Sequence, residues 1–236
     1  MQMVLSVAGV SALGGRDTNQ DSWYADQRLI TVADGVGGAP AGDVASRLAV
    51  DTVAAAGPDT DLADAVGRAN AAVRAHAEAH PDTEGMATTL IVAALVAREG
   101  GWFVRGAHVG DSITIVQNDR IQVLTSAHTL AAELVSAGHL TEEEGARHPN
   151  RAALVRAVGM ESSIRPDVWE RPAVAGDRYL LSSDGLTDAL GADLSTWLDR
   201  LRTADATQCA ETLVRSACEA GARDNVTVVI ADVLGG

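Results

Sequence analysis

Apolar runs of about five to ten residues, separated by short connections rich in Gly, Asp and Asn, recur along this chain, and that pattern predicts β-strands. Residues 29–33 predict a buried strand, and the almost wholly apolar residues 88–97 predict a central strand covered on both faces. The other predicted strands are residues 4–10, 23–26, 102–109, 113–117, 120–124, 168–171, 178–182 and 226–233. Because tight polar connections join the strands of residues 88–124, we expect an antiparallel meander there.

Helical periodicity is found in two pairs of segments, residues 41–55 with 62–80 and residues 193–202 with 206–220. Asp61 is a capping residue for the second of these helices, and Pro81 stops it. The order of elements favours an α+β fold in which antiparallel β-layers are covered by helix pairs. We expect one domain, residues 1–236, since this length supports one sizeable core.

Residues 125–159 interrupt the strand pattern. A short helix is expected at residues 130–137, and Thr141 with Glu144 forms a capping-box pattern that starts another. Residues 151–158 are amphipathic. We interpret residues 125–159 as a surface excursion, or flap.

Charge and composition exclude several classes of function. The formal net charge is −14, from 32 acidic and 18 basic residues, which disfavours nucleic acid and anionic membranes as partners. Every basic residue is Arg, which excludes Schiff-base chemistry and a P-loop lysine. The available anion-binding groups are therefore guanidinium forks, which suit phosphate.

The expected compartment is the cytoplasm. No basic residue precedes Arg16, so a secretory signal is not expected, and the apolar run at residues 90–97 is too short to span a bilayer. Cys209 and Cys218 lie nine residues apart on a predicted helix, which puts them on nearly opposite faces. They should therefore stay unbridged, as thiols do in a reducing compartment.

Five aspartates stand at predicted strand ends, each beside Gly, Asn or Ser. They are Asp21, Asp34, Asp111, Asp184 and Asp224. A turn alone explains any one of them, because Asp-Gly and Asp-Asn pairs are common in turns. Their recurrence favours a site instead, since carboxylates from separate strand ends are tolerated together when cations lie between them.

Oxygen ligands of this kind suit hard cations such as Mg²⁺ or Mn²⁺. Two such ions can share a carboxylate, turn a water molecule into a nucleophile and neutralise charge on a phosphoryl group. Arg16 lies five residues before Asp21 in the same loop and could grip phosphate oxygens. The pattern therefore points to hydrolysis of a phosphate ester.

Six polar motifs follow one another along the chain: Arg16-Asp17-Thr18-Asn19-Gln20-Asp21, Asp34-Gly35-Val36-Gly37-Gly38, Gly85-Met86-Ala87-Thr88-Thr89, Gly110-Asp111-Ser112, Ser183-Asp184-Gly185 and Arg223-Asp224-Asn225. In this order, and over nearly the whole chain, the sequence resembles the metal-dependent serine/threonine protein phosphatases of type 2C, of the bacterial kind. The resemblance implies a four-layer αββα sandwich of two antiparallel β-sheets flanked by pairs of antiparallel helices.

The resemblance also implies a metal centre of two Mn²⁺ or Mg²⁺ ions. Asp34 would bridge the ions and the Gly35 carbonyl would bind one of them. Asp184 and Asp224 would hold the other ion, and Asp21 would support the centre. The remaining implied roles are phosphate binding by Arg16 and a third, weaker metal site at Asp111 with Asp184. Residues 125–159 correspond to the family's flap, which bears on substrate access.

Four departures from the family pattern bear on rate and substrate handling. Ala39-Pro40 stands where bacterial members often carry His, Ile113 replaces an Arg, Ala127-His128-Thr129 replaces Asp-His-Ser, and Ala87 replaces a Gly. His128, His139 and His148 are expected on the flap surface. His76 and His80 have the spacing of paired metal ligands, but a solvated helix end explains them better.

The resemblance predicts a protein phosphatase that hydrolyses phosphoserine and phosphothreonine by direct attack of a metal-bridging water. Its partners would be phosphorylated proteins, namely serine/threonine kinases and their substrates, and we expect a monomer. One alternative is a catalytically weak, phosphoprotein-binding regulator of the same fold. Another is a serine hydrolase using Ser112 or Ser183, although no Gly-x-Ser-x-Gly elbow surrounds either residue.

Overall fold

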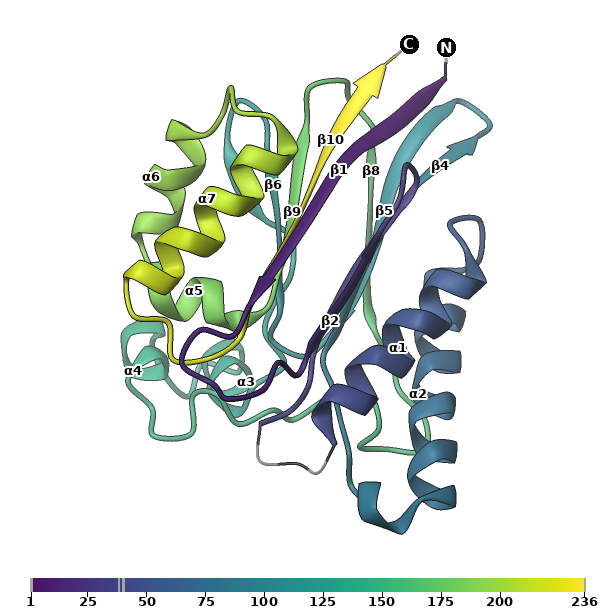
Figure 1. Cartoon of the computed structure of the whole chain (residues 1–236), viewed down its shortest axis with the longest axis vertical. Coiled ribbons are helices and arrows are strands. Elements are labelled where there is room, and N and C mark those ends of the chain that lie inside the picture. The colour runs from purple at the N-terminus through teal and green to yellow at the C-terminus, as the bar shows by residue number, and fades with distance from the viewer. Residues whose placement is uncertain (1, 38, 40, 236) are drawn as a thin grey trace.

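Ten strands form two five-stranded antiparallel sheets in the computed structural model, which describes residues 2–37, 39 and 41–235 (Figure 1). The first sheet has the order β1 (Met3–Ala12), β10 (Val226–Gly235), β9 (Arg178–Ser182), β6 (Ile113–Gln117), β7 (Ile121–Val123). The second has the order β2 (Asp21–Ala25), β3 (Leu29–Asp34), β4 (Leu90–Arg98), β5 (Gly101–Val109), β8 (Asp167–Pro172). The expected α+β fold is confirmed.

The expected meander over residues 88–124 is wrong in one respect. β4 pairs with β5 in the second sheet, but β6 and β7 belong to the first sheet, so the chain changes sheets between β5 and β6. The crossing is made at Gly110, whose φ is +102° and where a Cβ would lie 2.6 Å from Thr89 Cγ2. A tight polar turn that closes a hairpin therefore has the same sequence pattern as one at which the chain passes to another sheet.

Helices cover the outer face of each sheet (Figure 1). α1 (Gly42–Ala56) and α2 (Leu62–Ala79) pack on the second sheet, and α5 (Asp184–Leu190), α6 (Asp193–Arg200) and α7 (Ala206–Glu219) lie over the first. Asp61 caps α2 by accepting the backbone N–H groups of Ala63 and Asp64. α2 is followed by a 3₁₀ turn, η1 (Pro81–Thr83). α5 was not predicted, because it is short and begins with an Asp-Gly pair, which is common in turns.

Three apolar layers hold the sandwich together. One lies between the sheets and includes Ile91 and Leu181, and the other two lie between each sheet and its helices. Burial of a large aliphatic side chain stabilises a fold by roughly 1.5–3 kcal/mol, so these layers supply the main driving force. Cys209 is buried in the layer under α7 whereas Cys218 is exposed, and both are free thiols, which confirms the predicted separation.

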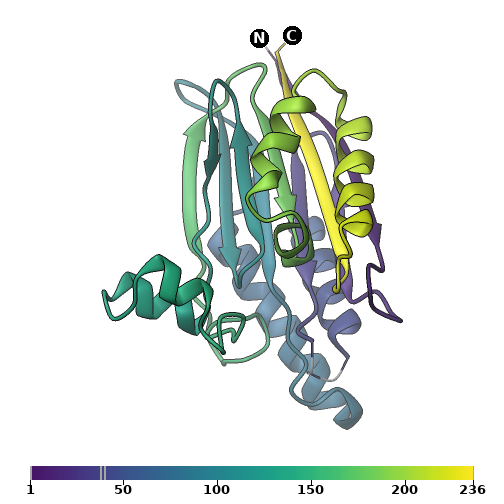
Figure 2. The same ribbon diagram turned by 90° about the vertical axis from the view of Figure 1, so that its left-hand side faces the viewer.

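Residues 125–159 project from one end of the sandwich, where Figure 2 shows their helices standing apart from the sheets. They contain α3 (Leu130–Ser136) and α4 (Glu142–Ala146), and the predicted capping box between Thr141 and Glu144 is present. Residues 151–158 form turns and isolated bridges rather than a helix, pairing Val158 with Thr88. In the described part of the chain, no helix combines the length and apolarity needed to cross a membrane.

Candidate metal and phosphate site

The strand-end aspartates gather at one end of the sandwich. Asp21 begins β2 and pairs in register with Asp34, the last residue of β3. Asp184 lies in the first turn of α5, directly after β9, and Asp224 lies two residues before β10. Asp111 occupies the turn at which the chain changes sheets. Both sheets therefore deliver carboxylates to the same end of the molecule.

Burial, together with repulsion from neighbouring carboxylates, raises the pKa values of Asp21, Asp34, Asp111 and Asp184. The pKa of Asp34 is raised well above its ordinary value, first by burial and then by Asp21, Asp184, Asp111 and Asp224. The pKa of Asp184 is raised to about 7 by burial and by the charge of Asp111, and that of Asp111 is raised to about 6, mainly by burial. Such a set of acids is relieved of repulsion when cations are bound among them.

Asp21 supplies a second indication that a cation belongs here. Its Oδ2 accepts a hydrogen bond from Ser183 Oγ at 2.8 Å, and Ser183 Oγ in turn accepts the Thr227 N–H at 3.0 Å. Its Oδ1 is buried and has no hydrogen-bond partner. A buried carboxylate oxygen left in this state is costly unless a ligand satisfies it.

The backbone beside Asp34 is held tightly. Thr89 Oγ1 accepts the Asp34 N–H at 2.9 Å, and Thr88 Oγ1 donates to the Asp34 carbonyl at 2.8 Å. Gly35 follows, and a Cβ added there would lie 2.4 Å from the backbone oxygen of Gly42. Glycine is required at this position because two backbone segments meet closely. Gly38, the last residue of the Asp34-Gly38 motif, lies outside the described residues. So does Pro40, which belongs to the Ala39-Pro40 departure from the family pattern.

Arg16 points into the aspartate cluster. Its Nη2 donates to Asp224 Oδ2 at 2.7 Å, and its side chain remains 46% exposed. Asn225 fixes the loop that carries Arg16: its Oδ1 accepts the Gln20 N–H, and its Nδ2 donates to the carbonyls of Leu13 and Thr18. Asn225 belongs to the Arg223-Asp224-Asn225 motif, so the sequence drew attention to it, but its role in holding the loop of Arg16 could not be predicted from the motif.

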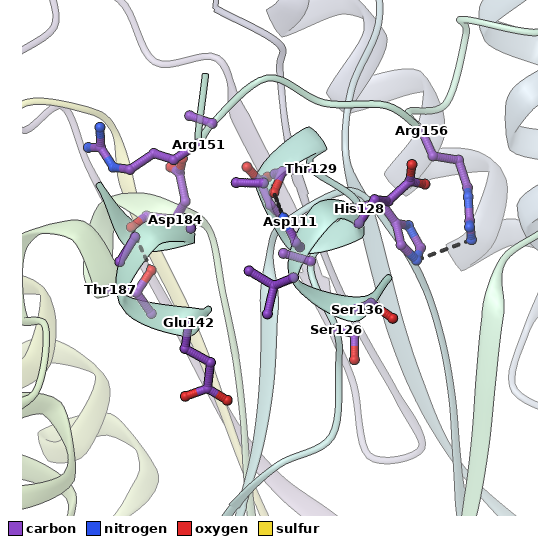
Figure 3. Close-up of a pocket in the computed structure, with 18 of the residues that line it drawn as sticks. Asp111, Ser126, His128, Thr129, Ser136, Glu142, Arg151, Arg156, Asp184 and Thr187 are labelled. Carbon is purple, nitrogen blue, oxygen red and sulfur yellow. Dashed lines mark hydrogen bonds between the residues drawn. The ribbon is translucent and has the colours of Figure 1, made fainter. Parts of the chain in front are cut away.

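A cavity of about 970 Å³ extends from Asp111 and Asp184 to the flap. Asp184 and Thr187 line one side of it in Figure 3, His128 and Arg156 lie on the other, and Asp111 lies between them. The prediction that His128 lies on the flap surface is wrong, because only 5% of it is exposed. Its neighbours Ala127 and Ser126 are exposed, so the local sequence carries no burial pattern that could have shown this.

His128 belongs to a second group of titratable residues. The donor atoms of His108, His128 and Asp167 lie within 4.8 Å of one another, a spacing that could hold a metal ion, and no other trio of His, Cys, Asp or Glu in the described residues does so.

The aspartate cluster should destabilise the metal-free protein increasingly as the pH rises. The folded state binds protons more tightly than the unfolded state at Asp34, Asp111 and Asp184, so the contribution of these groups to stability falls between about pH 4 and pH 7, through the raised pKa values. Mn²⁺ should remove this cost, and the gain in melting temperature on adding Mn²⁺ should grow from about pH 6 to pH 8.

Melting curves with Mn²⁺ and with EDTA at each pH measure this gain. The difference between the two series cancels other titrating groups, including the two buried histidines. A gain that is flat or that shrinks with rising pH would contradict the expectation.

Comparisons with known proteins agree with the geometry. Residues 8–217 match the family model described as protein phosphatase 2C. Over 228 residues the chain is 39% identical to the serine/threonine protein phosphatase PstP of Mycobacterium tuberculosis H37Rv, covering 93% of this chain but only 43% of PstP. It is 33% identical to the serine/threonine phosphatase stp of Listeria innocua, covering 93% of this chain and 88% of that protein.

The fold is also that of a solved structure. The catalytic domain of PstP in complex with two manganese ions superposes with a TM-score of 0.85 at 35% identity, covering 99% of this chain and 100% of that domain.

Proposed function

The chain belongs to the protein phosphatase 2C family, and we propose that it hydrolyses phosphoserine and phosphothreonine in phosphorylated proteins. The observation that carries this proposal is the gathering of five carboxylates from both sheets at one end of the molecule, among them Asp21 with its buried, unpartnered oxygen. The chain keeps Asp34, Asp184 and Asp224, which favours an enzyme over a catalytically weak regulator, since a degenerate member would usually have lost one of them.

We propose that Asp34 bridges two divalent ions, Mn²⁺ or Mg²⁺, and that the Gly35 carbonyl contributes to one of them. Asp184 and Asp224 would hold the other ion, with Asp21 supporting the centre and Asp111 joining Asp184 at a third, weaker site. When bound, such ions supply an activated water nucleophile at neutral pH and neutralise charge on the phosphoryl group.

The protein's own groups orient the substrate. Arg16 is anchored by Asp224 at 2.7 Å and remains half exposed, so its other N–H groups can bind the phosphate oxygens of the substrate. The Asp224 carboxylate fixes the plane of the guanidinium and reduces the entropy lost when the phosphate binds. The Thr227 N–H holds the Ser183 hydroxyl, and this hydroxyl donates to the Asp21 carboxylate and fixes its orientation.

The finer biological assignments are also proposals. The substrates would be serine/threonine kinases and the proteins that they phosphorylate. We infer a monomer acting in the cytoplasm without nucleic acid or membrane, in line with two free thiols and a net charge of −14. Residues 1–236 would act as one catalytic domain, with residues 125–159 as the flap bordering the cavity.

Hydrolysis of a phosphothreonine peptide tests the function directly. We expect turnover with Mn²⁺ and with Mg²⁺, and its complete loss in EDTA with recovery on adding Mn²⁺ back. Turnover that persists in EDTA would point to a serine hydrolase using Ser112 or Ser183. If calorimetry shows Mn²⁺ binding but the peptide is not hydrolysed with either metal, the enzyme assignment is overturned in favour of a regulator.

A further inference from the structure

His128 is tied to the turn that carries Asp111. Its backbone N–H donates to the Gly110 carbonyl at 3.0 Å, and the Gly110 N–H donates to the His128 ring at Nδ1, at 3.1 Å. The two residues are eighteen positions apart, so these bonds join the start of the flap to the point where the chain changes sheets. Asp111 is the next residue after Gly110 and lines the cavity with His128.

The bond from Gly110 is compatible with only one neutral tautomer of the ring. Because Nδ1 accepts a backbone N–H, the neutral ring carries its proton on Nε2. Nε2 faces the Asp167 carboxylate, with Oδ2 at 3.4 Å, and burial lowers the pKa of His128, which keeps the ring neutral. A proton on Nδ1 would instead set two donors against each other.

The Arg156 guanidinium is the positive charge that lies beside His128 and Asp167. Its Nη1 donates to Asp167 Oδ1 at 2.8 Å and to the Arg165 carbonyl at 3.1 Å, and it lies 3.1 Å from His128 Nε2 (Figure 3). A metal ion on Nε2 would have to displace this guanidinium and would move the ring proton to Nδ1, against the Gly110 N–H. The trio of His108, His128 and Asp167 therefore fits a hydrogen-bonded support better than a metal site.

The support is rigid on its remaining sides. The His108 ring stacks on the His128 ring with centroids 4.7 Å apart, and His108 Nε2 lies 2.9 Å from the Ser126 carbonyl. His108 also pairs in register with Asp167 between β5 and β8. The ring of His128 is thus held on one face, at both nitrogens and through its backbone.

We propose that His128 is a positioning residue for Asp111: its Nδ1 accepts the Gly110 N–H and fixes that amide, and thereby the Asp111 carboxylate. The inference rests on the proposed function, in which Asp111 serves the weaker metal site. Partners that orient a metal-binding group typically change metal affinity by about 10- to 100-fold when removed.

Three substitutions separate this role from general support. In His128→Asn the side-chain oxygen can still accept the Gly110 N–H near the place of Nδ1, whereas His128→Gln offers its amide nearer the place of Nε2, and His128→Ala offers neither. We expect Ala and Gln to weaken the weaker class of Mn²⁺ sites by roughly 10-fold or more, and Asn to remain close to wild type. His139, an exposed residue of the flap, provides a matched control: the His139→Ala variant should bind Mn²⁺ like wild type.

Mn²⁺ binding should be followed by calorimetry and by electron paramagnetic resonance, with melting curves for each variant. The Mn²⁺ concentration for half-maximal peptide hydrolysis should rise in parallel, with a smaller change in the KM for the peptide. Unchanged binding in His128→Ala, or binding in His128→Asn as weak as in His128→Ala, would overturn the proposal. So would equal loss of the tight and weak sites in all three variants, because that result indicates only a structural role.

Different results would contradict the phosphatase function and the role of His128. If wild type binds Mn²⁺ at two classes of site but hydrolyses no phosphopeptide, the proposed function fails. The calorimetric comparison of the three variants still decides the role of His128.

Discussion

The Asp34→Asn variant should lose at least roughly 10³-fold in kcat for a phosphothreonine peptide, because bridging metal ions contribute several kcal/mol to phosphoryl transfer and about 4 kcal/mol corresponds to that factor. An amide keeps the size of the side chain but removes the charge and one ligand oxygen that two cations would share. The Thr88 and Thr89 contacts with Asp34 involve its backbone, so they survive the substitution.

The same variant should be no less stable than wild type in EDTA. Asp34 is repelled by four other carboxylates and its pKa is raised by burial, so removing its charge relieves the metal-free fold, most of all at about pH 8. The melting temperature in EDTA should therefore rise or stay level, while the gain on adding Mn²⁺ should largely vanish.

A matched control is Asp199→Asn, which removes a charge from the exposed side of α6, where Asp199 pairs with Arg202 at 2.9 Å and does not line the cavity. It should keep most of the activity, since exposed ion pairs contribute little. If Asp34→Asn retains Mn²⁺-dependent turnover near the wild-type level, or if its metal-free form melts well below wild type, the placement of the ions at Asp34 is wrong.

The long elements and the candidate site could be predicted because both depend on local pattern. Residues 29–33 and 226–233 are apolar runs bounded by polar turns, and the strands found there overlap the predicted ranges. The aspartates were located at strand ends because each stands beside Gly, Asn or Ser at the end of an apolar run. Their convergence was inferred from chemistry, since five acids explained singly by turns are better explained together by cations.

What could not be predicted depends on contacts between distant segments. The change of sheet at Gly110 depends on Thr89, which is remote in sequence, and the burial of His128 depends on Gly110 and Asp167. α5 is only seven residues long, and its first residues form an Asp-Gly pair typical of turns. Short helices are defined by what they pack against rather than by periodicity, which needs a longer window.

Gly185 shows how closely such a short helix is fitted to the site. It is buried in the first turn of α5, and a Cβ added there would lie 2.1 Å from the backbone oxygen of Asn225 and 3.3 Å from Val226 Cγ2. The obstructing atom belongs to the backbone, so no rotamer change can relieve it. Either Asp184 with α5 or the segment of Asp224 must move, and both carry carboxylates of the site.

We therefore expect Gly185→Ala to destabilise the fold by about 2–3 kcal/mol, as overpacking against rigid neighbours does. For a chain of this size that corresponds to a fall in melting temperature of roughly 5–10 °C. Asp184 and Asp224 would be pushed apart, so the gain in melting temperature on adding Mn²⁺ should be smaller for this variant than for wild type. Peptide hydrolysis should also fall by more than the loss of folded protein explains.

The same substitution in α2 gives a control of opposite sign. Gly67 is a helix-interior glycine with no atom within 4 Å of an added Cβ, so Gly67→Ala should stabilise the protein by about 0.5–1 kcal/mol through the lower entropy of the unfolded chain. Melting curves of the two variants in EDTA and in Mn²⁺ decide the matter. If Gly185→Ala melts with or above wild type, α5 can shift without cost, and the fixed spacing of Asp184 and Asp224 is not what the site requires.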